Sequence, residues 1–186
     1  LAPGSSFKPI SSIASLEEGV INTDTIIDCT GKYEEVTPNI RCWIWPSEHG
    51  NENLVDGIKN SCNYFFADLG HRLATDSKGN YNSELGMERI RKYASDFGLN
   101  EKSGVELDEA EPRISTYDPE RSAMGQANHA FNAAQLARYI TAVANSGSLY
   151  KLSIVDKIKD PRNNVVEERS PELEKTLSYS DVTWNA

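Results

Sequence analysis

A serine and a lysine three residues apart, Ser5 and Lys8, lie near the start of the 186-residue sequence and could perform nucleophilic chemistry. On a helix such positions share one face, with side-chain roots about 5–6 Å apart, so Lys8 can reach the Ser5 hydroxyl. A serine becomes a strong nucleophile when a base takes its proton, and lysine serves as that base when burial lowers its pKa. A chain of this length is expected to contain about one S-x-x-K pattern by chance. Alone, the pair therefore favours the ordinary alternative, a capped helix with a surface lysine.

A second pair of polar side chains, Ser61 and Asn63, lies between two expected helices. In a loop, a hydroxyl and a carboxamide two residues apart can point into one cleft, whereas on a helix they would diverge by about 200°. The ordinary alternative is an N-cap and turn pair.

Thiols and imidazoles form the third candidate group, which consists of Cys29, Cys42, His49 and Cys62. These side chains suit zinc, but their spacing along the chain matches no compact zinc motif. A metal site, a Cys29–Cys42 disulfide and free thiols all remain open, and the spacing favours free thiols and no metal. His71 and His129 have no acid so placed as to suggest a catalytic triad.

The elements that must position these residues follow from the apolar periodicity. A helix from Phe7 to Leu16, ending at Gly19, would place Ser5 at or just before its N-terminus. Other helices are expected near 54–58, 64–73, 83–97 and 133–144, and one begins near 180. We expect Ser83 to cap the third of these, and Leu136 and Ile140 to lie on the buried face of the fourth. Strands are expected at 26–27, 40–43, 150–158 and 165–166, with a turn at 160–164.

Composition indicates one globular domain of the α+β class. The chain is 38% hydrophobic and 25% charged, and we expect a single domain over residues 1–186. Within it we expect a loop-rich segment at 20–51, a helical core at 52–147 and a strand-containing tail at 148–186. A net charge of -9 argues against nucleic acid or anionic lipid as a partner. No apolar run approaches the roughly 20 residues needed to cross a bilayer.

Several segments, taken in order, resemble the penicillin-binding protein transpeptidases, particularly the class B, monofunctional kind. They are Pro3-Gly4-Ser5-Ser6-Phe7-Lys8-Pro9, Cys42-Trp43, His49-Gly50, Ser61-Cys62-Asn63, Gly104-Val105-Glu106-Leu107, Gly125-Gln126 and the stretch from Ala133 to Gly147. The resemblance spans nearly the whole chain. It implies the mostly helical portion of the transpeptidase fold, with part of the antiparallel sheet missing at both ends.

The resemblance also implies roles for the two pairs. Ser5 would attack a carbonyl and become acylated, Lys8 would take its proton, Ser61 would help relay the proton to the leaving group, and Asn63 would bind the substrate amide. The implied reaction is peptidoglycan D,D-transpeptidation with no metal or organic cofactor, and β-lactams would acylate the same serine. The implied partners are stem peptides and a cell-wall glycan polymerase, outside the cytoplasmic membrane, with a membrane anchor that precedes this chain.

A third motif of the family, Lys-Ser/Thr-Gly, is expected beyond Ala186. Lys102-Ser103-Gly104 has the right letters, but it lies in a polar loop too early in the chain. We therefore expect a truncated chain that lacks one oxyanion donor. Such a loss costs about 3–4 kcal/mol of transition-state stabilisation, so the chain alone should be inactive or nearly so.

Two alternatives to a transpeptidase remain. A β-lactamase or β-lactam sensor acylates in the same way, but the sequence shows no deacylating acid at a recognisable position. A non-catalytic binding or scaffold module would use Ser5 and Lys8 only to cap a helix.

Overall fold

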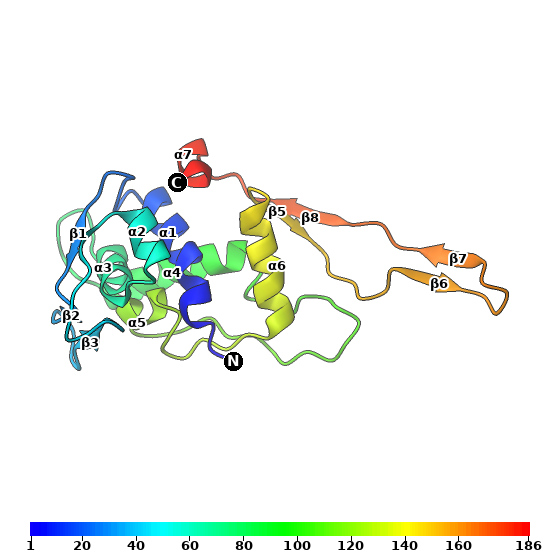
Figure 1. The fold of residues 1–186 in the computed structure, drawn as a ribbon, viewed down its shortest axis with the longest axis horizontal. Helices are drawn as coiled ribbons and strands as arrows, with labels where there is room; N and C mark the ends of the chain where they lie inside the picture. Colours follow the sequence, from blue (N-terminus) through cyan, green and yellow to red (C-terminus); the bar gives the residue numbers. More distant parts are fainter.

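The computed structural model describes residues 1–186 and shows a helical body from which a long β arm projects (Figure 1). The helices are the 3₁₀ turn η1 (Gly4–Phe7), α1 (Lys8–Glu17), α2 (Leu54–Lys59), α3 (Asn63–Leu73), α4 (Ser83–Asp96), α5 (Pro119–Ala123), α6 (Ala133–Ala144) and α7 (Asp181–Asn185). The strands are β1 (Ile27–Cys29), β2 (Lys32–Tyr33), β3 (Ile40–Arg41), β4 (Gly50–Glu52), β5 (Ser148–Tyr150), β6 (Lys157–Lys159), β7 (Val165–Glu168) and β8 (Leu173–Thr176). The α+β prediction is confirmed. None of the helices combines the length and apolar character that crossing a bilayer requires.

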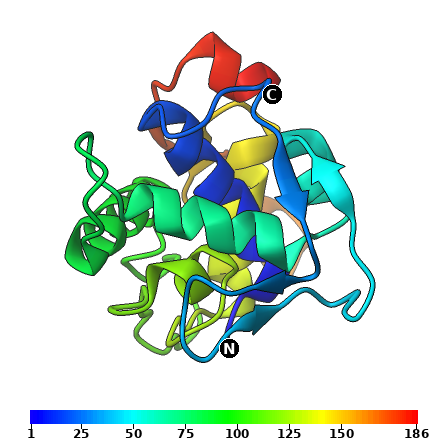
Figure 2. The same cartoon turned by 90° about the vertical axis from the view of Figure 1, so that its left-hand side faces the viewer.

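The strands form four antiparallel pairs rather than one sheet. β1 pairs with β4, and β2 pairs with β3. Figure 2 shows these four short strands along one side of the helices. β1, β2 and β3 pack against α3, which begins at Asn63, and β4 packs against α2.

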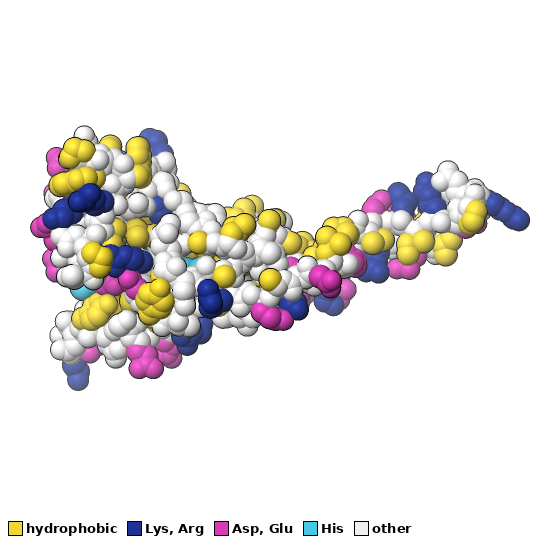
Figure 3. Space-filling model, turned by 90° about the horizontal axis from the view of Figure 1, so that it is seen from below, with side chains coloured by type: hydrophobic (Ala, Val, Ile, Leu, Met, Phe, Trp, Pro, Cys, Tyr) yellow, Lys and Arg dark blue, Asp and Glu magenta, His cyan; other side chains and the backbone are white.

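The β arm consists of the β5–β8 pair at its base and the β6–β7 hairpin at its tip. It is a narrow extension in Figure 3, and every residue of β6 and β7 is exposed. The predicted turn at 160–164 is confirmed, because the Asp160 carboxylate accepts from the backbone of Arg162 and Asn164 at 2.8 and 2.9 Å. The prediction of a single strand over 150–158 is wrong. Only Ser148–Tyr150 and Lys157–Lys159 are paired, and β8 was not predicted.

Two clusters of buried side chains form the core. The first joins η1, α1, α4 and α6, and includes Phe7, Ile10, Leu73, Ile90, Phe97 and Tyr139. The second lies between α3 and the short strands, and includes Cys29, Tyr33, Cys42, Cys62, Phe65 and Phe66. Phe7 in the first cluster and Cys62 in the second are direct neighbours in sequence of the residues singled out for chemistry.

Two expectations about helices are corrected. Asn82, not Ser83, caps α4, because its side-chain oxygen accepts from the backbone N–H of Glu84 at 2.9 Å. On α6, Ile140 is 40% exposed and Tyr139 is fully buried. Polar partners decide this face: Arg138 donates to the Tyr150 carbonyl, and the Tyr139 hydroxyl donates to the Ser6 carbonyl.

Replacing Gly70 with alanine should destabilise the protein. An added Cβ would meet the backbone of α5, including the Pro119 carbonyl and the Glu120 Cα at 2.6 Å. Intrinsic helix preference alone would make Gly→Ala stabilising by about 1 kcal/mol, whereas overpacking against backbone costs about 1–3 kcal/mol. We expect a lower free energy of unfolding in urea. A variant at least as stable as the wild type would contradict this close approach of α3 and α5.

Candidate active site

A hydrogen-bonded chain links Ser5, Ser61 and Lys8. Ser61 Oγ lies 2.7 Å from Ser5 Oγ, and Lys8 Nζ donates to Ser61 Oγ at 3.0 Å. Ser5 lies in η1 and Lys8 opens α1, and in a 3₁₀ turn residues three apart eclipse each other. The direct Lys8–Ser5 contact expected from the sequence is replaced by a contact through Ser61. The reason is that the ammonium turns toward the oxygen atoms of the 61–63 segment.

Lys8 is a buried lysine whose ammonium meets polar atoms on one side and an aromatic ring on another. Lys8 is 2% exposed, and its Nζ also donates to the Ser61 carbonyl at 2.7 Å and to Asn63 Oδ1 at 3.1 Å. The Phe66 ring lies 5.1 Å from Nζ. Burial lowers the pKa of Lys8 to about 8 because the charged form loses solvation. The neutral amine is therefore more populated near neutral pH than it is in an exposed lysine.

The backbone between α2 and α3 explains why Ser61 and Asn63 face the same lysine. Ser61 has a positive φ of 49°, an uncommon conformation for a residue with a side chain. Cys62 then returns to an extended conformation and caps α3, with the Phe65 N–H 3.4 Å from its sulfur. The left-handed turn at Ser61 brings both its carbonyl and its hydroxyl to Lys8. The catalytic roles of these residues remain predictions.

Two residues to which sequence analysis gave no role hold the Ser5 turn in place. The Gly4 N–H donates to the Gly125 carbonyl at 3.0 Å, and Gly125 has φ +78°. A Cβ at Gly125 would collide with the Gly4 carbonyl, so only glycine fits there. Tyr139 reaches the Ser6 carbonyl from α6. The Gly125-Gln126 segment of the sequence was a visible signal for the contact between Gly4 and Gly125. The apolar periodicity gave no signal for the contact of Tyr139.

His129 packs beside η1, the turn that carries Ser5. Its Nδ1 accepts from the Ser115 N–H at 3.0 Å, and its Nε2 lies 3.1 Å from the Ser122 carbonyl. The ring lies 4.3 Å from that of Phe7. Burial lowers the pKa of His129 to about 4, so the imidazole is neutral and packs beneath η1.

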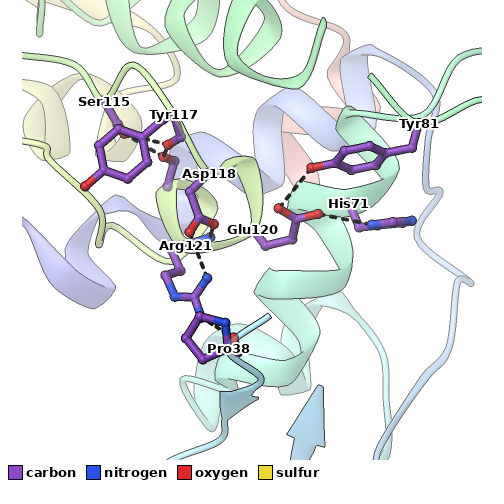
Figure 4. A network of polar contacts seen from close by, with 9 residues as sticks. Pro38, His71, Tyr81, Ser115, Tyr117, Asp118, Glu120 and Arg121 are labelled. Carbon is purple, nitrogen blue, oxygen red and sulfur yellow. Dashed lines mark hydrogen bonds and ion pairs between the residues drawn. The ribbon is translucent and has the colours of Figure 1, made fainter. Parts of the chain in front are cut away.

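A second polar network surrounds Glu120 (Figure 4). Its carboxylate, 2% exposed, lies 3.1 Å from His71 Nδ1 and accepts from the Tyr81 hydroxyl at 3.3 Å. His71 therefore has an acid partner that its place in the sequence does not indicate, because packing of α5 on α3 brings together residues distant in sequence. Asp118 caps α5 and binds Arg121 at 2.7 Å. These contacts fasten α5 to its surroundings.

Lys102-Ser103-Gly104 forms contacts within its own loop. Lys102 pairs with Glu111 at 2.8 Å, and the Ser103 hydroxyl and Gly104 N–H both donate to Glu109. No hydrogen bond joins this tripeptide to Ser5, Lys8 or the 61–63 segment. These contacts agree with its interpretation as a chance match.

The cysteines are buried and unbridged. Antiparallel pairing nevertheless brings the ligand atoms of Cys29, Cys42, His49 and Cys62 within 4.8 Å of one another. Spacing along the chain does not show this proximity, because the β1–β4 pair, the Cys42–Gly31 contact and the start of α3 bring these residues together.

Comparison with known proteins places these features in context. The model of the penicillin-binding protein transpeptidase domain matches residues 1–185. Stage V sporulation protein D of Bacillus subtilis is 31% identical over 94% of this chain, which spans 26% of that protein. Peptidoglycan D,D-transpeptidase MrdA of Acinetobacter baumannii is 24% identical over 56% of this chain and 14% of its own length. Thus the chain spans about a quarter or less of these relatives.

Solved structures share the fold. Penicillin-binding protein A of M. tuberculosis, as an acyl-enzyme complex with ceftriaxone, superposes with a TM-score of 0.79 at 19% identity, over 98% of this chain and 40% of that one. A peptidoglycan synthase complex that coordinates polymerization and crosslinking gives a TM-score of 0.77 at 24% identity, over 98% of this chain and 31% of that one.

Proposed function

Because this chain belongs to the penicillin-binding protein transpeptidase domain family, we propose that it forms the serine-bearing part of a peptidoglycan D,D-transpeptidase. The observation that carries the proposal is the chain from Ser5 through Ser61 to the buried Lys8. It joins a nucleophile, a relay hydroxyl and a base of lowered pKa.

In the proposed acylation, Ser5 Oγ attacks the donor carbonyl of a stem peptide. The Ser5 proton moves to Ser61 Oγ as the Ser61 proton moves to neutral Lys8. Collapse of the tetrahedral intermediate breaks the peptide bond, and the leaving amine takes a proton back through the same relay. Asn63 keeps its NH₂ group for the substrate, because its oxygen is engaged by Lys8. An acceptor amine then attacks the acyl-enzyme and restores Ser5.

The proposed setting is the outer face of the cytoplasmic membrane, where stem peptides are accessible and β-lactams act as covalent mimics. Support comes from the acyl-enzyme complex of penicillin-binding protein A. The peptidoglycan synthase complex supports a glycan polymerase as partner. In this proposal, membrane attachment comes from a segment outside this chain.

A transfer assay tests the proposal. The protein, extended beyond both ends of residues 1–186, would be incubated with a stem peptide ending in D-Ala-D-Ala and with an acceptor amine. We expect the acceptor-linked product together with released D-alanine. Hydrolysis of the peptide or of a β-lactam without transfer would favour the β-lactamase alternative, and absence of any turnover would favour the non-catalytic module.

Acylation should depend on pH through Lys8. The neutral amine is the base, and burial lowers the pKa of Lys8 to about 8. The rate constant for acylation by penicillin should therefore rise as pH increases, roughly tenfold per unit below pH 8, and level off above it. Stopped-flow measurement between about pH 6 and pH 9, corrected for labelling of the Ser5→Ala variant, checks this. A flat profile would show that Lys8 is not the group whose deprotonation limits acylation.

A further inference from the structure

Three sulfurs and one imidazole nitrogen lie together beside the 61–63 segment. His49 Nδ1 lies 3.6 Å from Cys29 Sγ and 3.5 Å from Cys42 Sγ. The sulfurs of Cys42 and Cys62 are 3.9 Å apart, and all four atoms fit within 4.8 Å. Such convergence of four soft donors in one place has no counterpart elsewhere in the chain.

The separations match those around a tetrahedral zinc ion. With Zn–S near about 2.3 Å and Zn–N near about 2.0 Å, a tetrahedron separates two sulfurs by about 3.8 Å and a sulfur and a nitrogen by about 3.5 Å. The observed 3.9, 3.5 and 3.6 Å agree with these values. A disulfide requires sulfurs about 2.0 Å apart, and any pairing of two cysteines would leave the third beside His49.

The fold holds the four side chains in position. In the β1–β4 pair, Cys29 lies opposite Gly50, the residue after His49. The Cys42 N–H donates to the Gly31 carbonyl at 2.9 Å, which fastens the end of β3 beside β1. All three cysteines are buried in the second core cluster. Strand pairing thus places Cys29 beside the segment of His49, the Gly31 contact holds Cys42, and Cys62 is held as the N-cap of α3.

Two further observations concern His49. No group of the protein bonds to its buried Nε2, so its polar contacts are those of Nδ1 with the sulfurs. The Trp43 ring covers it at 5.5 Å and is itself held by a 2.9 Å hydrogen bond to the Asn60 carbonyl. Nδ1 of the half-buried imidazole is therefore aimed into the cluster, and the Trp43 ring lies against it edge to face.

We propose that Cys29, Cys42, His49 and Cys62 bind one Zn²⁺ in a closed, four-coordinate site. Binding forms three Zn–S bonds and one Zn–N bond, and each thiol that ligates releases its proton to solvent. With all four positions filled by protein, the ion has no place for water or substrate, so its role is structural. The site is separate from the Ser5 relay but shares a segment with it.

Zinc would act on the hydrogen-bonded chain from Ser5 through Ser61 to Lys8 by holding Ser61 in position. Cys62 lies directly between Ser61 and Asn63, the two residues that contact Lys8. Fixing the Cys62 sulfur anchors the left-handed turn at Ser61 and the N-terminus of α3. This consequence, unlike metal binding itself, rests on the proposed function of Ser5.

Metal binding is tested on the reduced, chelator-stripped protein, both as residues 1–186 and extended at both ends. We expect one Zn²⁺ per chain in competition with a chromophoric chelator, with release of protons. Co²⁺ in place of Zn²⁺ should show the sulfur-to-metal charge transfer and d–d bands of a tetrahedral thiolate site. Failure of the reduced, folded protein to bind either ion, or Co²⁺ spectra without thiolate bands, would overturn the proposal.

Single substitutions assign the ligands. Cys29→Ser and His49→Gln should each weaken Zn²⁺ binding by more than about 100-fold, since loss of a ligand exceeds the loss of an outer-shell partner. His71→Gln is the matched control, because His71 contacts Glu120 instead, and its Zn²⁺ affinity should equal that of the wild type. Equal affinity in His49→Gln and wild type would contradict the assignment. Formation of a Cys42–Cys62 disulfide in protein that binds no zinc would replace the proposal with a redox pair.

The positioning effect has its own readout. In the extended protein, removing zinc should slow acylation by penicillin, and adding Zn²⁺ should restore it in the wild type but not in His49→Gln. Stoichiometric zinc binding with an unchanged acylation rate would show that zinc does not position the Ser61 turn for acylation and serves only the stability of the fold. If zinc binds but Ser5 is never acylated, the metal site stands and the proposed function fails.

Discussion

Ser5→Ala should abolish covalent labelling by penicillin in the extended protein. The Ser5 hydroxyl belongs to an exposed residue and has a hydrogen-bonded path through Ser61 to the buried Lys8. Since the acyl group must be attached to the nucleophile, loss of its oxygen leaves nothing to acylate. The fold should survive, because Ser5 is exposed and its side chain hydrogen-bonds only to Ser61. Intact mass after incubation with penicillin measures the effect.

Ser6→Ala provides the matched control. Ser6 is the next residue in the same 3₁₀ turn, but its hydroxyl donates to the Pro3 carbonyl at 2.8 Å rather than to the relay. This variant should acquire the penicilloyl mass as the wild type does. Labelling that persists in Ser5→Ala, or disappears in Ser6→Ala while the protein stays folded, would contradict the assignment of the nucleophile.

Lys8→Met should slow acylation by about 10²–10⁴-fold, the usual contribution of a positioned general base. Methionine fills similar space beside Phe66 but cannot accept the proton. The substitution also leaves the Ser61 carbonyl and Asn63 Oδ1 without their donor, which costs about 1–3 kcal/mol for a buried group. The expected result is a slower second-order rate constant together with a lower melting temperature.

Two further lysine variants separate chemistry from charge. Lys59→Met removes an exposed lysine of α2 and should change neither the second-order rate constant of acylation nor the melting temperature. Lys8→Arg keeps a positive charge and can still donate hydrogen bonds, but the guanidinium does not lose its proton in proteins. It should therefore acylate as slowly as Lys8→Met if folded. A Lys8→Arg variant with wild-type acylation would show that the charge, and not a base, is required.

The sequence predicted the local parts of the site better than their connections. Ser5 and Lys8 could be placed on one helical face because three-residue spacing has a fixed geometric meaning. Ser61 could be placed in a loop, but its positive φ, which turns it between Ser5 and Lys8, left no signal in the residue type. The relay through Ser61 therefore required the structure.

Tertiary contacts account for the other differences. Tyr139 is fully buried because its hydroxyl finds the Ser6 carbonyl, whereas periodicity had favoured Ile140 for that face. His71 gains Glu120 from a helix that was not predicted. The cysteines meet His49 through the pairing of β1 with β4 and the contact of Cys42 with Gly31. In each case the contact depends on how the chain folds back on itself, so no local pattern records it.

The most direct test of the account is to locate the adduct after penicillin treatment. The extended protein would be digested and its peptides mapped by mass spectrometry, beside residues 1–186 treated in the same way. We predict one penicilloyl group in the extended protein, on the peptide that contains Ser5, and little or none in residues 1–186 alone. An adduct on a different serine, or a folded extended protein that acquires none, would contradict the assignment of Ser5 as the acylated nucleophile.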